Sequence, residues 1–134
     1  MLVNIRLKIC VVIFLIGVFC CNCKKNQDQV PPSIVIQMPL SNSSFDLPNS
    51  IRIKGTVSDN NLLQNIEIGI LDENLSAIVT DIHIELNDQE YSFDETIILD
   101  NRLIESGSYY ISIKAFDQQN NQNSSYQEIT ISEI

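Results

Sequence analysis

Acidic and amide residues follow two of the apolar segments in this 134-residue chain. Asp59 and Asn60 come directly after one such segment, and Asp117 and Asn121 come after another. Carboxylate and amide oxygens, completed by backbone carbonyls, are the ligands that Ca²⁺ prefers in proteins. The four residues therefore predict a calcium site if the fold brings the two segment ends together. The alternative is that Asp and Asn are present as ordinary turn formers.

Aromatic residues indicate a second kind of binding chemistry. Tyr110, Phe116 and Tyr126 lie on or beside residues 117–126, for which the sequence predicts a long, flexible, amide-rich loop. Tyr110 and Phe116 share one face of a strand, because alternate side chains of a strand point the same way. Aromatic rings stack on sugar rings, and nearby amides hydrogen-bond to sugar hydroxyls. These residues predict a glycan-binding surface, and ordinary exposed aromatic residues on a sheet are the alternative.

Residue types that support catalysis are scarce after residue 23. This part of the chain has no cysteine and a single histidine, His83, and it has no glycine-rich phosphate loop. Catalysis needs a positioned nucleophile, base or donor, and no spacing here supplies such a set. We therefore expect a non-enzymatic protein, with Ca²⁺ as the one cofactor that the residues suggest.

Charge restricts the partners of the chain. Residues 31–134 contain 16 acidic and four basic residues, a net charge of −12. Such a surface is repelled by nucleic acid and by anionic membrane surfaces. Nucleic-acid binding is therefore not expected.

The elements that must position these residues are strands. Apolar and polar residues alternate in seven segments, separated by turn-forming clusters that include residues 41–49. The seven segments are 34–38, 51–57, 66–70, 78–86, 91–97, 109–115 and 129–131. This pattern predicts one all-β domain over residues 33–134, a seven-stranded antiparallel sandwich of immunoglobulin type. A small barrel has the same strand pattern and stays open as an alternative.

Three motifs resemble known proteins. The run ESGSYYISIKAFD at 105–117 resembles the tyrosine corner of immunoglobulin domains, with Gly107 at the turn and Tyr109 in the tyrosine position. That resemblance implies that the Tyr109 hydroxyl bonds to nearby backbone. Together with PSIVIQMP at 32–39 and IKGTVSDN at 53–60, the run resembles the immunoglobulin-like modules of Bacteroidetes lipoproteins. In that topology the two loops with the predicted calcium ligands lie at the same end of the sandwich.

The beginning of the chain predicts a lipid anchor. An apolar run of 13 residues follows Arg6 and Lys8, and cysteines stand where a signal peptide is cut. The run is short for a membrane span, which takes about 20 residues. We expect a lipoprotein signal peptide over residues 1–22, with Cys21 or Cys23 as the lipidated residue, and a polar linker over 23–32. A short uncleaved anchor is the alternative.

These features together predict where the protein works and with what. Two or three acyl chains on one cysteine, palmitate among them, hold a protein firmly on a membrane. We expect attachment to the bacterial envelope, at the outer membrane and facing the periplasm. Exposed edge strands of the sandwich are suited to pairing with an envelope protein partner. Assembly of an envelope complex is thus the leading function, and glycan or calcium binding in nutrient uptake is the alternative.

Overall fold

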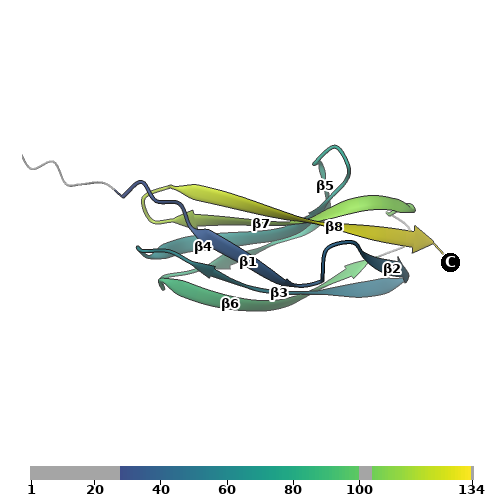
Figure 1. The fold of residues 1–134 in the computed structure, drawn as a ribbon, viewed down its shortest axis with the longest axis horizontal. Helices are drawn as coiled ribbons and strands as arrows, with labels where there is room; N and C mark the ends of the chain where they lie inside the picture. Colours follow the sequence, from purple (N-terminus) through teal and green to yellow (C-terminus); the bar gives the residue numbers. More distant parts are fainter. Residues whose placement is uncertain (1–27, 100–103, 134) are drawn as a thin grey trace, which may run out of the picture.

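The computed structural model describes residues 28–99 and 104–133 (Figure 1). The predicted signal peptide and both candidate lipidation sites, Cys21 and Cys23, lie outside these residues. The described part of the chain forms eight strands, which are β1 (Ser33–Met38), β2 (Ser43–Leu47), β3 (Asn49–Ser58), β4 (Leu63–Leu71), β5 (Ala77–Glu85), β6 (Glu90–Leu99), β7 (Gly107–Asp117) and β8 (Gln122–Glu133).

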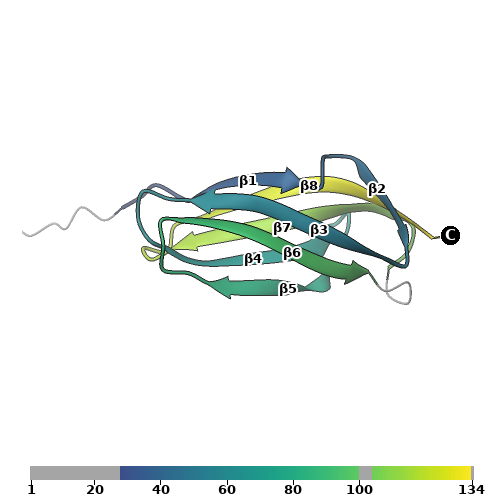
Figure 2. The same ribbon diagram turned by 90° about the horizontal axis from the view of Figure 1, so that it is seen from below.

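Two sheets face each other in a sandwich (Figure 2). One has three strands in the order β1-β3-β6, and the other has five in the order β2-β8-β7-β4-β5. The predicted sandwich is therefore present, but two details of the prediction were wrong. The described residues hold eight strands rather than seven, and β2 runs parallel to β8 rather than antiparallel to its neighbour.

The additional strand, β2, lies where the sequence predicted a loop. Turn formers dominate residues 41–49, and Asn42 does take the left-handed conformation, with a φ of 62°. After that turn Phe45 and Leu47 point toward the core and alternate with exposed residues. The chain thus leaves the three-stranded sheet after β1 and joins the five-stranded sheet as β2. The Gln127 side chain holds this crossing by donating a hydrogen bond to the Pro39 carbonyl.

Alternation along the strands builds the core. Side chains at every second position point between the sheets, so each strand supplies one apolar row. Branched aliphatic residues dominate these rows, as expected for pleated surfaces that pack face to face. The largest fully buried side chains are Phe93, Ile51, Ile53, Leu63, Ile66, Ile68, Ile70, Leu99, Ile111, Ile113, Ile129 and Ile131.

A glycine makes room for the largest of these side chains. Gly55 on β3 lies opposite Phe93 on β6 in the antiparallel register. A Cβ atom at position 55 would lie 2.5 Å from Phe93 Cζ and 2.3 Å from the Val35 carbonyl oxygen. Both distances are shorter than any van der Waals contact, so the phenyl ring occupies the space of the missing side chain.

The outer face of the three-stranded sheet is polar and carries one well-formed ion pair. Arg52 donates from Nε to Asp94 Oδ1 at 2.6 Å and from Nη2 to Asp94 Oδ2 at 2.5 Å. This two-pronged hydrogen bonding holds the pKa of the Asp94 carboxyl below its usual value.

Among residues 28–99 and 104–133, no helix is long and apolar enough to cross a membrane.

Candidate functional site

Three carboxylates from three segments meet at one end of the sandwich. Asp28 precedes β1, Asp59 follows β3 and Asp117 ends β7, and one oxygen from each lies within 4.8 Å of the others. We call these three residues the carboxylate cluster. Asp59 and Asp28 are partly buried, and Asp117 is fully buried, with 0% of its surface exposed.

Asp117 organises the loop between β7 and β8. Its Oδ1 accepts hydrogen bonds from the backbone N–H groups of Gln119 and Asn121, at 2.8 and 2.7 Å. Its Oδ2 accepts a third from the Asn121 side-chain amide at 2.7 Å. The loop also contains Asn120 in the left-handed conformation, with a φ of 65°, a geometry that asparagine adopts more readily than most residues. The carboxylate position is therefore fixed by the backbone.

Asp59 is held less completely. Its Oδ1 accepts a hydrogen bond from the Asn61 backbone N–H at 2.7 Å, a local turn of the kind that aspartate favours. Its Oδ2 exposes less than 1 Å² and accepts no hydrogen bond from the described residues. A buried carboxylate oxygen without a partner is unfavourable, since it has lost water and gained nothing in exchange.

Asp28 joins the cluster from the segment that the sequence predicted to be a plain linker. Side-chain amides of Asn61 and Asn60 donate to its Oδ2 at 2.6 and 3.2 Å. These amides, with the Asn61 bond as the largest contribution, hold the pKa of the Asp28 carboxyl below its usual value. Asn121 donates to the Asp28 carbonyl at 3.1 Å, and Asn123 donates to the Pro32 carbonyl at 2.9 Å.

The four predicted calcium ligands thus come together, with two different roles. Asp59 and Asp117 contribute carboxylates, whereas Asn60 and Asn121 turn their amide nitrogens toward carboxylates. Sequence reasoning missed Asp28, because nothing in the polar linker over residues 23–32 indicates which part of it will dock on the domain. The signal that could have indicated docking is the pair of asparagines, Asn121 and Asn123, whose side chains donate to backbone carbonyls of this linker.

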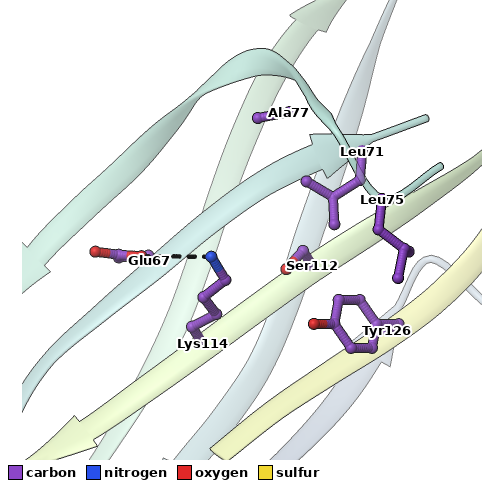
Figure 3. Close-up of a pocket in the computed structure, with 7 residues that line it drawn as sticks. All are labelled: Glu67, Leu71, Leu75, Ala77, Ser112, Lys114 and Tyr126. Atoms are coloured by element: carbon purple, nitrogen blue, oxygen red, sulfur yellow. Dashed lines mark ion pairs between the residues drawn. The ribbon is translucent and has the colours of Figure 1, made fainter. Parts of the chain in front are cut away.

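A second candidate site lies on the outer face of the five-stranded sheet. Figure 3 shows this hollow, about 140 Å³ in volume, which we call the sheet hollow. Ser112 lies at its centre, with Leu71, Leu75 and Tyr126 around it. The remaining lining residues are Ala77, Glu67 and Lys114, and the last two form an ion pair at 4.0 Å.

The turn between β4 and β5 supplies one wall of the sheet hollow. Asp72 Oδ1 accepts hydrogen bonds from the N–H groups of Asn74 and Ser76, both at 2.8 Å. Between them Leu75 takes a left-handed backbone conformation, with a φ of 60°, and 54% of its surface is exposed. That conformation is uncommon for leucine, and strain of this kind concentrates at binding sites.

The predicted aromatic surface is divided by the sheet register. Tyr126 lines the sheet hollow and lies opposite Ser112, with 48% of its surface exposed. Tyr110 lies on the same outer face one diagonal position away, opposite Glu128. Phe116 lies opposite Gln122 and is four residues along β7 from Ser112, the residue that faces Tyr126. Phe116 is therefore not a neighbour of Tyr126.

The tyrosine corner is present as the sequence resemblance implied. Tyr109 is buried, and its hydroxyl donates a hydrogen bond to the Glu105 carbonyl at 2.8 Å. Burial raises the pKa of this hydroxyl above its usual value. Gly107 precedes it at the start of β7, with a φ outside the left-handed region.

Comparison with known proteins supports the fold. No protein-family model and no curated protein matches this chain. Among solved structures, the fibronectin(III)-like modules of CbhA from Clostridium thermocellum are similar, with a TM-score of 0.52 and 15% identity over 75% of this chain and 96% of that one. CopC from Methylosinus trichosporium OB3b matches with a TM-score of 0.46 and 13% identity, over 76% and 94% of the two chains.

The fold therefore places this protein in a broad structural class. It is an immunoglobulin-like β-sandwich, and its likeness to fibronectin(III)-like modules extends over three quarters of the chain. Many unrelated activities occur on such sandwiches, so the fold by itself does not define the function.

Proposed function

We propose that this protein is a non-catalytic module, anchored to the bacterial envelope by a lipid, that assembles with an envelope protein partner. The observation that carries the proposal is the edge of the three-stranded sheet that β6 forms. Strand β6 has ten residues and pairs with β3 along one side, and no other strand of the described residues pairs with its second side. Unpaired backbone groups along an edge are a template for an added strand.

An exposed apolar residue marks the site on this edge. Ile98 on β6 exposes 78% of its surface, on the polar outer face of the sheet. Backbone hydrogen bonds would give a partner strand affinity, and a side chain such as Ile98 would give it specificity. Since residues 31–134 carry a net charge of −12, electrostatic attraction favours a basic segment as that partner.

Ile98→Lys is expected to abolish recovery of the partner, because charged residues on an edge strand oppose strand addition. The measurement is crosslinking in intact membranes followed by affinity purification of the full chain. Gln37→Lys is the matched control, since Gln37 is exposed on β1 at the opposite edge of the same sheet.

Two results would contradict the proposal. One is recovery of the wild-type protein alone with several crosslinkers, and the other is equal loss of the partner in both variants.

The same preparation gives the mass of the mature amino terminus. We expect an acylated cysteine at Cys21 or Cys23, and an unmodified full-length terminus would remove the anchor from the proposal.

Glycan binding is a second candidate, favoured by the sheet hollow. Its exposed Tyr126 ring offers a stacking surface, and the Glu67–Lys114 pair offers charged hydrogen-bond partners at the rim. The strained, exposed Leu75 has no evident role in the core, which is consistent with a part in ligand contact.

Tyr126→Ala is expected to weaken binding of any glycan that the wild-type protein retains by at least about fivefold, because loss of an aromatic stacking surface removes roughly 1 kcal/mol or more. A glycan array followed by titration of the hits measures this. Tyr110→Ala is the control, since Tyr110 lies on the same face but outside the hollow. Absence of any retained glycan, or equal losses in the two variants, would exclude the sheet hollow as a glycan site.

A further inference from the structure

The carboxylate cluster has the dimensions of a cation site. Calcium binds oxygens at 2.3–2.6 Å, so two oxygens on opposite sides of one ion are about 5 Å apart at most. The three carboxylate oxygens lie within 4.8 Å of one another, so a single ion can contact all three. Three negative charges this close repel each other, and a cation among them would offset that repulsion.

The unpartnered oxygen of Asp59 is a separate observation that points to a ligand. Asp59 Oδ2 is buried, exposes less than 1 Å² and accepts no hydrogen bond from residues 28–99 or 104–133. Native proteins rarely leave such an atom unsatisfied, and an ion is one of the standard explanations. In the loop that Asp117 organises, Gln119 Oε1 is also buried and accepts no hydrogen bond from the part of the chain that the structure describes.

The hydrogen bonds already present leave room for the ion. A carboxylate has about four lone pairs that can accept a hydrogen bond or bind a metal ion. Each amide N–H that donates to Asp28 or Asp117 occupies one of them. Such amides orient the carboxylates in the way that outer groups orient metal ligands elsewhere. Hard oxygen ligands without nitrogen or sulfur favour calcium over transition metals.

From this arrangement we infer that Asp28, Asp59 and Asp117 bind one Ca²⁺, and that the ion fastens the segment before β1 to the end of the sandwich. Asp28 is the ligand through which the ion would connect the segment before β1 to the sandwich. The other two carboxylates belong to loops of the sandwich, whereas Asp28 belongs to the segment that leads into it. Without the ion, that segment is held by hydrogen bonds from asparagine amides.

Fastening this segment has a consequence for orientation, which rests on the lipid anchor proposed above. Four residues lie between Cys23 and Asp28, so the five steps that join their Cα atoms span at most about 18 Å when fully extended. Calcium would then hold the end that carries the β3–β4 and β7–β8 loops close to the membrane. The calcium site itself does not depend on the anchor or on a protein partner.

The test uses the full chain, purified in detergent, stripped of metal with EDTA and titrated with CaCl₂ in a calorimeter. We expect one Ca²⁺ per chain and a rise in Tm of about 10 °C when the free ion exceeds its Kd about 100-fold. MgCl₂ should give a smaller rise, since Mg²⁺ sheds water reluctantly and demands octahedral ligands.

Asp59→Asn separates an ion site from a structural role of this residue. The amide keeps the oxygen that accepts the Asn61 N–H but removes a charge. In EDTA the variant should melt at or above the wild-type Tm, and its affinity for Ca²⁺ should fall at least about tenfold. If Asp59 stabilised the fold without an ion, the substitution would instead lower the Tm in EDTA. Asp46→Asn, with its exposed aspartate on β2, is the control that should change neither value.

A final measurement tests the fastening. Amide hydrogen exchange at residues 28–30 should slow at least about tenfold on addition of Ca²⁺, and Asp28→Asn should remove this effect. Four results would overturn the inference. They are absence of binding heat and Tm change at millimolar Ca²⁺, an equal response to Mg²⁺, a lowered Tm of Asp59→Asn in EDTA, or exchange at residues 28–30 that is insensitive to the ion.

Discussion

Gly55→Ala is expected to lower the free energy of unfolding by about 3 kcal/mol, at the upper end of the cost of overpacking a core. The new methyl group would meet both the Phe93 ring and the Val35 carbonyl oxygen at less than 3 Å. The ring has no empty space to enter, because a close-packed core surrounds it, and the carbonyl belongs to backbone paired within the sheet.

Urea denaturation of the full chain measures this change. Gly107→Ala is the matched control, because a Cβ atom at position 107 meets nothing closer than 3.7 Å. We expect that variant to stay within about 0.5 kcal/mol of wild type. A loss at position 55 no greater than the loss at position 107 would show that the Gly55–Phe93 packing described here is wrong.

Tyr109→Phe is expected to cost about 1–2 kcal/mol of stability. The substitution keeps the buried ring but removes the hydroxyl that donates to the Glu105 carbonyl. Loss of one partner of such a bond leaves the other without compensation. The same denaturation experiment applies, with Tyr126→Phe as the control because Tyr126 is half exposed on the outer face. Equal effects of the two substitutions would mean that the corner contributes nothing particular.

Much of the sandwich follows from local pattern. Alternation of isoleucine and valine with polar residues located β1, β3 to β7 and the last part of β8, because each sheet has one buried and one solvated face. The predicted loop over 117–126 was wrong in its second half, because β8 already begins at Gln122. The motif around Tyr109 anticipated both its burial and its hydroxyl bond. Strand β2 escaped detection because its apolar signal is two residues long, Phe45 and Leu47, inside a cluster of turn formers. Its pairing with β8 is a tertiary contact between distant segments.

The candidate sites were predictable to different degrees. Asp59 and Asp117 were expected to meet because the topology sets two loops at one end, and they do. Asp28 was not expected, since its position depends on side-chain amides of residues 60, 61 and 121 rather than on any periodic pattern. The sheet hollow depends on the strained turn at Leu75, whose left-handed backbone contradicts the preference of leucine.

The parallel pairing of β2 with β8 has a mechanical consequence. The segment that leads into β1 and the end of β8 lie at opposite ends of the long axis of the sandwich (Figure 1). Tension between them pulls β8 lengthwise past both of its neighbours, β2 and β7, so the five residue pairs with β2 are loaded together rather than one by one. A ladder strained in this direction resists until its bonds break at once, whereas one pulled open from its end unzips bond by bond. We therefore expect β2, the short strand that the sequence pattern did not predict, to add to the resistance of the domain to stretching.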